Sequence, residues 1–154
     1  MIASKLGFTY FLLALIVTPS ILLAQQKNAD TTISDGKRLD IIFADRYNYQ
    51  KLDSINEFIS LAGKVQVRQG NTLFYADSAV LNRQLNSLEA FGNVHINDAD
   101  SIHTYAQYLK YLGKEKKAFL KNKVRLTDGK GVLTTEELEY DVSIKIGTYL
   151  KGGK

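Results

Sequence analysis

The stretch "AFGNVHIND", residues 90–98, decides the fold because it joins a corner to an alternating strand. Gly92 tolerates the backbone angles of a sharp bend. After it, Val94 and Ile96 point to one side of an extended chain, and His95 points to the other. An apolar spacing of two residues is typical of a strand with one buried face.

The same pattern recurs along the chain, which indicates an internal repeat of about 30 residues. It appears again as "LAGKVQV" at 61–67 and as "LKNKVRL" at 120–126. Three apolar columns keep step at intervals of 29 or 30 residues. The first column is Val65, Val94 and Val124, the second is Val80, Leu109 and Leu138, and the third is the pairs Ile59/Leu61, Leu88/Ala90, Ala118/Leu120 and Thr148/Leu150.

The columns predict an all-β fold built from repetitive units. The segments "RQGN", "NDAD" and "TDGKG" lie between the predicted strands and have the composition of turns. The stretch "SINEFISLAG" at 54–63 is predicted to be a strand, because Ile59 and Leu61 belong to the third column. In such a fold each unit contacts mainly its neighbours, so the stack is elongated.

The N-terminal segment has the features of a secretory signal peptide. Lys5 precedes an apolar run, and small Ala24 marks the expected cleavage site, so residues 1–24 are predicted to be removed. Residues 25–36 are then a linker and residues 37–154 the repeat domain. Cleavage lowers the formal net charge from +4 to +3, which is too little to indicate nucleic-acid binding. The chain has no cysteine, which excludes disulfides and thiolate metal sites.

The sequence shows no constellation that predicts an enzyme. His95 and His103 have no third ligand at a fixed spacing, so no metal site is expected. Asp45 and Asp77 share an "AD" context and are predicted to form hydrogen bonds with local backbone at strand corners rather than to act as a catalytic pair. The basic stretch at 110–130 is interpreted as a solvated face rather than a rim for lipid phosphates. No cofactor is expected.

The order of the segments "LAGKVQV", "YADSAVLN", "NSLEAFGNVHI", "NKVRLTD" and "LTTEELEYD" resembles the OstA-like family, of the LptA and LptD N-terminal type, in the version carried by Bacteroidetes-like bacteria. The resemblance covers residues 37–154. It implies a twisted, V-shaped β-jellyroll whose interior holds lipid acyl chains and which stacks end to end across the periplasm. Asn122 replaces the usual glycine of the third corner, and asparagine also tolerates that conformation. The last repeat, ending in "YLKGGK", is expected to be incomplete, as in a fragment of a longer protein.

The resemblance implies that the apolar columns line a trough for lipopolysaccharide. A trough for sliding acyl chains needs aliphatic surface and no specific hydrogen-bond partner. The periodicity fits a closed, dry core equally well. The expected lipid-binding residues are Val65, Val67, Val80, Val94, Ile96, Leu109, Val124, Leu126 and Leu138.

The expected role is therefore a non-enzymatic, periplasmic lipopolysaccharide carrier, with a further association with the outer membrane. The alternative is a structural β-repeat of the cell surface, such as an adhesin or stalk, and a glycan-acting enzyme ranks third. Lipopolysaccharide and related jellyroll proteins of the transport bridge are the expected partners. Open sheet edges also predict head-to-tail self-association by strand addition, because the mature chain has no proline to block it.

Overall fold

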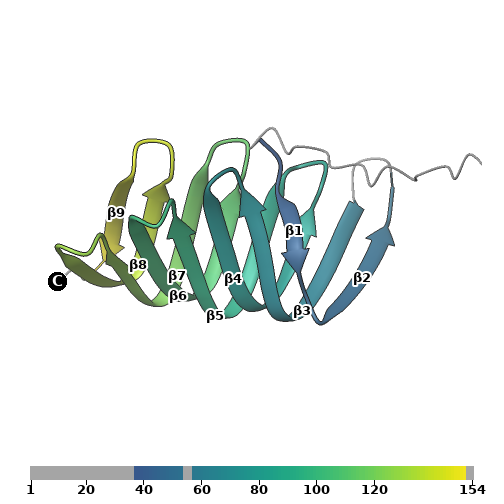
Figure 1. Cartoon of the computed structure of the whole chain (residues 1–154), viewed down its shortest axis with the longest axis horizontal. Helices are drawn as coiled ribbons and strands as arrows, with labels where there is room; N and C mark the ends of the chain where they lie inside the picture. Colours follow the sequence, from purple (N-terminus) through teal and green to yellow (C-terminus); the bar gives the residue numbers. More distant parts are fainter. Residues whose placement is uncertain (1–36, 54–56, 152–154) are drawn as a thin grey trace, which may run out of the picture. The chain divides into compact units, whose positions relative to one another are not determined.

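The computed structural model describes residues 37–53 and 57–151, which form one antiparallel sheet (Figure 1). In these ranges the strands are β1 (Asp40–Phe43), β2 (Arg46–Lys51), β3 (Glu57–Gln69), β4 (Thr72–Asn82), β5 (Ser87–Asp98), β6 (Ile102–Leu112), β7 (Lys117–Thr127), β8 (Val132–Asp141) and β9 (Ile146–Lys151). No helix in the same ranges is long and apolar enough to cross a membrane. The predicted signal peptide and linker lie outside the described residues.

Each strand from β3 to β9 pairs with the next along the chain, so the sheet grows by simple hairpins. The N-terminal strands depart from this order, because β1 and β2 both pair with β3. β2 lies against the first half of β3, and β1 lies against the second half of β3. The all-β, repetitive architecture predicted from the apolar columns is confirmed, and the predicted strand at 57–63 is part of β3.

Most long strands bend once near the middle, where the pairing register shifts. A bulge of this kind lets a strand turn a corner without ending. In β3, β5 and β7 the corner is a pair of residues with positive φ, a conformation that favours Gly and Asn. These pairs are Gly63 and Lys64 (φ 79° and 49°), Gly92 and Asn93 (70° and 43°), and Asn122 and Lys123 (65° and 54°).

The corners divide the sheet into two walls. Wall A is the part next to the turns at 83–86, 113–116 and 142–145, and wall B is the part next to the turns at 70–71, 99–101 and 128–131. The ring of Phe74 in wall B lies 4.6 Å, centroid to centroid, from the ring of Tyr111 in wall A. The inner faces of the two walls therefore pack against each other, and the core lies between them.

The first two corners are built around glycine and aspartate. A Cβ atom on Gly92 would lie 2.4 Å from Oδ2 of Asp77, and a Cβ atom on Gly63 would lie 2.4 Å from Oδ2 of Asp45. The Asp77 carboxylate also accepts a 2.9 Å hydrogen bond from the side chain of Asn93. Both aspartates thus lie at corners, as predicted, but the Asp77 carboxylate is bound by the side chain of Asn93 on the neighbouring strand and not by the predicted local backbone. Their close approach requires glycine on that strand.

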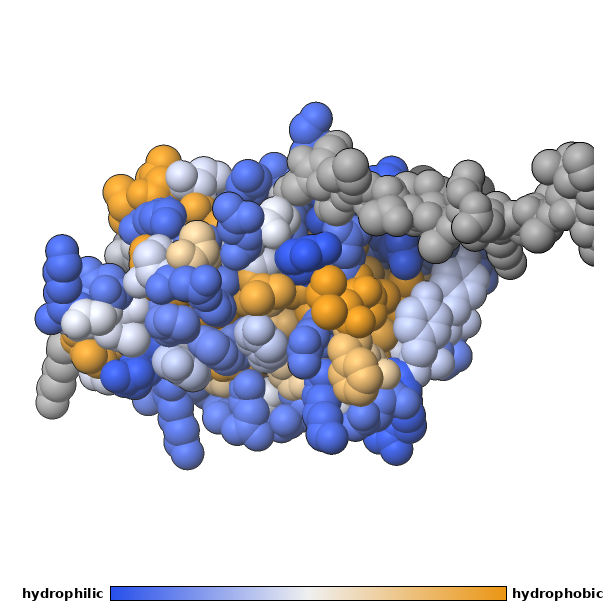
Figure 2. Space-filling model, in the orientation of Figure 1, coloured by the Kyte–Doolittle hydropathy of each residue, from blue (hydrophilic) through white to orange (hydrophobic). Residues whose placement is uncertain are grey.

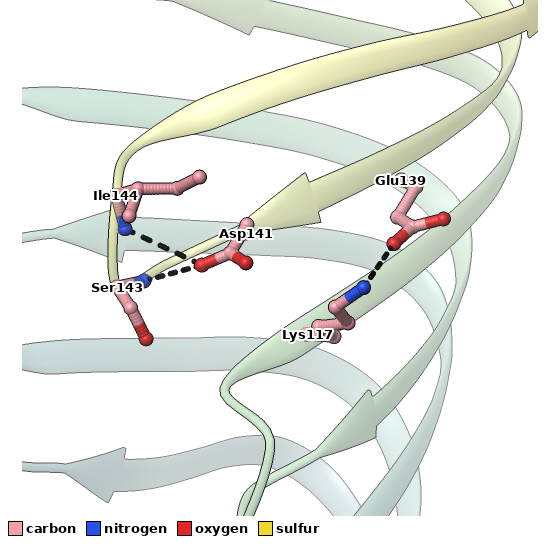
Figure 3. A network of polar contacts seen from close by, with 5 residues as sticks. All are labelled: Lys117, Glu139, Asp141, Ser143 and Ile144. Atoms are coloured by element: carbon pink, nitrogen blue, oxygen red, sulfur yellow. Dashed lines mark hydrogen bonds and ion pairs between the residues drawn. The ribbon is translucent and has the colours of Figure 1, made fainter.

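The turn between β8 and β9 is held by a side-chain cap (Figure 3). Oδ1 of Asp141 accepts hydrogen bonds from the backbone N–H groups of Ser143 at 2.9 Å and Ile144 at 3.3 Å. Nearby, Lys117 of β7 forms a 2.8 Å ion pair with Glu139 of β8. Most basic side chains of the stretch at 110–130 are exposed, which agrees with a solvated face.

Candidate functional site

The first predicted column forms a row on the inner face of wall B. Val65, Val94 and Val124 directly follow the corners of their strands and are 1–2% exposed. Two residues further along, Val67 and Ile96 are fully buried on the same face. The strand alternation read from "AFGNVHIND" is confirmed for these side chains.

A second inner row runs across wall A. Leu109 pairs with Leu120, which pairs with Leu138, and all three are buried. Leu126, on the inner face of wall B, is only partly buried against the core. Eight of the nine predicted residues therefore line the space between the walls, which is closed around most of them.

The ninth residue, Val80, is on the wrong face. Its partner in β5 is Glu89, whereas Ala79 pairs with Ala90 and so occupies the inner row that contains Leu109. The prediction that Val80 shares a row with Leu109 and Leu138 is wrong. The column was aligned one residue off, and in a strand a one-residue slip turns a side chain to the opposite face.

The same slip affects the end of the third column. Thr148 pairs with Glu139 on the outer face, and Tyr149 pairs with Leu138 in the inner row. An irregularity in the pairing between Glu137 and Leu138 shifts the register there. The prediction that Thr148 continues the third column is therefore wrong, while the earlier members of that column are buried.

The two walls also meet along their edges remote from the corners, and this line of contact is called the seam. Hydrogen bonds from tyrosine hydroxyls close it. The hydroxyl of Tyr111 donates to Oε1 of Gln69 at 2.5 Å, and the hydroxyl of Tyr140 donates to Oδ2 of Asp98 at 2.8 Å. Burial raises the pKa of both tyrosines far above the ordinary value of 10.0, and the nearby Asp98 adds to the effect. Both hydroxyls therefore stay protonated and remain donors.

Further polar contacts close the seam near β1. Nε2 of Gln69 donates to the backbone oxygen of Gly113 at 3.0 Å, which joins the end of β3 to the turn after β6. The backbone N–H of Leu39 donates to Oδ1 of Asn86 at 2.9 Å. These bonds were not predicted from the sequence. The sequence did carry one signal of these bonds, a shared repeat spacing. Gln69 and Asp98 are 29 residues apart, and so are Tyr111 and Tyr140.

The interior is less covered where the sheet ends at β8 and β9. Leu126 and Leu133 are only partly buried, and Tyr149, which pairs with Leu138 in the inner row, is 55% exposed. Within the described residues, β9 pairs only with the part of β8 in wall A, so the wall B part has no partner on that side. An apolar end and an unpaired strand segment therefore coincide.

Exposed apolar side chains gather at both ends of the strand order. Figure 2 shows apolar surface beside β1 and at the turn between β8 and β9. Ile42 and Phe43 on β1 are 46% and 45% exposed, and Ile144 on the turn is 63% exposed. Contiguous apolar surface of this kind is typical of an interaction site.

The histidines lie on the outer face of wall B. The ring of His95 stacks between those of Tyr75 and Tyr105, and its Nε2 lies 3.1 Å from Nδ1 of His103. Burial, and then the charge of His103, lower the pKa of His95 below 6.5. Among residues 37–53 and 57–151, no group of three or more His, Cys, Asp or Glu side chains could hold a metal ion.

Comparison with known proteins places this geometry in a family. A solved structure of LptH from Pseudomonas aeruginosa, described as the LptA-homologous periplasmic component of the lipopolysaccharide transport device, has a TM-score of 0.63 and 19% sequence identity. The match covers 77% of this chain and 87% of LptH, and it shows a shared β-jellyroll fold. No curated protein matches the sequence. The family model of OstA-like proteins matches residues 37–154, and the chain therefore belongs to the OstA-like family.

Proposed function

We propose that this protein is a periplasmic, non-enzymatic carrier that binds lipopolysaccharide and forms part of a bridge to the outer membrane. Membership of the OstA-like family and the fold shared with LptH support this role. The observation that carries the proposal is the largely apolar inner surface of both walls, which becomes partly exposed at β8 and β9. The predicted signal peptide supports export to the periplasm.

Eight inner residues are proposed to contact the acyl chains. Their side chains are aliphatic and come from β3, β5, β6, β7 and β8. Thr104 pairs with both Ile96 and Leu126, so an acyl chain sliding along these residues meets one buried hydroxyl. Val80 is left out of the proposal because it lies on the outer face. The proposed lipid-contacting residues are Val65, Val67, Val94, Ile96, Leu109, Val124, Leu126 and Leu138.

Lipid would enter by separating the walls at the seam. Each seam hydrogen bond contributes roughly 0.5–1.5 kcal/mol net, whereas burying an acyl chain contributes about 0.8 kcal/mol per methylene. A chain of more than a few carbons therefore offsets the loss of the Tyr111 and Tyr140 bonds. Packing of one wall against the other is replaced by packing against the lipid, because the inner faces and the acyl chains are both apolar.

The exposed edges support the proposed bridge. The wall B part of β8, Val132–Thr135, presents backbone donors and acceptors without proline or lysine, and such edges accept another strand. We infer that a related jellyroll, or a second copy of this chain with β1 and β2 leading, continues the sheet there. The apolar side chains of both ends would be covered in the same contact.

Native mass spectrometry of protein purified from a Gram-negative host, followed by lipid extraction, tests the proposal. Co-purified lipopolysaccharide is expected, and the Tyr111→Phe/Tyr140→Phe variant, whose seam is weaker, should carry more of it. Protein that remains lipid-free, also after incubation with purified lipopolysaccharide, would contradict the carrier function.

A second candidate function is a structural β-repeat of the cell surface. It is favoured by one observation, namely that Val67, Ile96 and Leu109 are 0% exposed, as in a permanently dry core. In that case the seam would stay closed, and no lipid would be recovered under any condition of the same experiment.

A further inference from the structure

The outer face of wall A carries a pocket that faces away from the core. Its volume is about 460 Å³, within the range of roughly 300–1,000 Å³ typical of small-molecule sites. It lies between the turn at 83–86 and the turn at 113–116. Its apolar lining is Phe58, Val80, Leu85 and Leu112.

The hollow results from side-chain size along one cross-strand row. Phe58 pairs with Asn82, Asn82 pairs with Ser87, and Ser87 pairs with Leu112. Two small polar side chains thus lie between two large apolar ones, and they form the floor. Leu85, 52% exposed on the neighbouring turn, adds a further apolar wall.

Asn82 brings an unused hydrogen-bond donor to this pocket. The residue is 3% exposed, and its Oδ1 accepts the backbone N–H of Leu85 at 2.9 Å. Its Nδ2 is buried and has no hydrogen-bond partner among residues 37–53 and 57–151. A buried donor without a partner is unfavourable and is rare in folded proteins.

The cap of the turn does not require that donor. Asp141 occupies the equivalent place before the turn between β8 and β9, and its carboxylate caps the turn as an acceptor alone (Figure 3). The amide of Asn82 therefore offers one group, Nδ2, beyond what the turn uses. An oxygen acceptor in the pocket would satisfy it.

The charges around the pocket balance one another. Lys110 and Lys114 line it together with Glu89 and Glu115, and Glu89 also accepts a hydrogen bond from Tyr108. This balance favours a neutral ligand over an anionic or a cationic one. The lining as a whole suits a molecule with an apolar group next to an uncharged acceptor.

We propose that this pocket binds a neutral amphipathic small molecule in which an aliphatic group adjoins an amide or ester carbonyl. The carbonyl oxygen accepts a hydrogen bond from Nδ2 of Asn82, and the aliphatic group lies against Phe58, Val80 and Leu112. The site is on the opposite face of the sheet from the inner rows. It does not depend on the proposed lipopolysaccharide carrier function.

Titration of the ¹⁵N-labelled chain with octanamide, followed by NMR, tests the site. Saturable shifts are expected in the side-chain amide of Asn82 and in the backbone amides of Leu85, Ser87 and Leu112. Asn82→Asp keeps the acceptor that caps the turn and removes the donor, so its affinity should fall about tenfold. Ser87→Leu fills the floor of the pocket from the outer face and should abolish the shifts.

Three results would overturn the proposal. The first is the absence of saturable shifts at the pocket up to the solubility limit of octanamide. The second is binding to Ser87→Leu with unchanged affinity, a comparison that remains valid if Asn82→Asp does not fold. The third is tighter binding of octanoate than of octanamide, which would assign the site to an anion held by the lysines. Thermal unfolding of both variants checks that the fold is retained.

Discussion

The hydroxyl of Tyr140 donates a 2.8 Å hydrogen bond to Oδ2 of Asp98, 42 residues earlier in the chain, and so joins wall A to wall B across the seam. The other carboxylate oxygen of Asp98 accepts a 3.1 Å hydrogen bond from Oγ1 of Thr72. All three side chains are buried. Tyr111 and Gln69 repeat the cross-wall bond one unit earlier, at the same separation of 42 residues.

Tyr140→Phe is expected to lower the free energy of unfolding by about 1–3 kcal/mol, because it leaves one oxygen of a buried carboxylate without its donor. Urea unfolding measures the change. Tyr149→Phe is the control, since that side chain is 55% exposed, and it should change stability by less than about 0.5 kcal/mol. Equal effects of the two substitutions would show that the seam bond contributes nothing.

Gly92→Ala is expected to destabilise the protein more than Gly129→Ala. Both glycines have positive φ, 70° and 82°, so alanine costs roughly 1–2 kcal/mol of backbone strain at either position. At Gly92 the new Cβ meets Oδ2 of Asp77 at 2.4 Å, while at Gly129 no atom of the described residues lies within 4 Å of it. Overpacking should add about 1–3 kcal/mol, measured by chemical denaturation.

The contact with Asp77 can be isolated by a double mutant. In an Asp77→Ala background, Gly92→Ala should lose most of its additional cost, whereas Gly129→Ala should be unaffected. Equal costs of Gly92→Ala in both backgrounds would mean that backbone strain alone requires glycine at this corner.

Leu81→Ala and Val80→Ala test the assignment of faces in β4. Leu81 is fully buried on the inner face, so its truncation should cost about 2–5 kcal/mol. Val80 lies partly buried on the outer face, and its truncation should cost less than about 1 kcal/mol. Thermal or urea unfolding of the two variants decides the matter, and a larger effect at Val80 would restore it to the inner row.

The fold was predictable because the repeat is visible in side-chain alternation. The corner in "AFGNVHIND", with Val94 and Ile96 after it, predicts the bend, the strand and the buried face correctly. Val80 and Thr148 were misplaced because the spacing between equivalent residues is 29 in some units and 30 in others. An apolar column is still recognisable in the sequence when the spacing differs by one residue. In a strand, however, a shift of one residue turns the side chain to the opposite face.

The seam could not be predicted because its partners meet only after the sheet bends. Gln69 and Asp98 end apolar strands and look like ordinary polar residues before a turn. Nothing around them in the sequence indicates a bond to a tyrosine three hairpin turns later. The pocket beside Asn82 depends on the sizes of side chains on neighbouring strands. Predicting the pocket requires the pairing register of these strands. The apolar pattern of the sequence defines that register only to within one residue.

Acidification is expected to destabilise the fold through His95. Burial and His103 lower the pKa of His95 below 6.5, so the folded protein disfavours the protonated ring relative to the unfolded chain. The unfolded state then binds more protons, and the contribution of His95 to stability is complete above pH 6.5 and is lost as the pH falls through the lowered pKa. Unfolding should be followed between about pH 7.5 and about pH 5.

His95→Gln removes this titration and should flatten the pH dependence in that interval. The substitution leaves the neighbouring side chains Tyr75, Tyr105 and Arg125 unaltered. A slope identical to that of the unsubstituted protein would assign the pH dependence to other groups.

Site-specific photo-crosslinking to lipopolysaccharide tests the central claim most directly. A photoreactive side chain is placed in turn at Ile96 and Leu126, which face the interior, and at His95 and Arg125, which face outward. Strand geometry predicts strong capture from the first two positions and little from the other two. Equal capture from both faces, or none from the inner positions while the protein remains folded, would contradict a lipid-carrying interior.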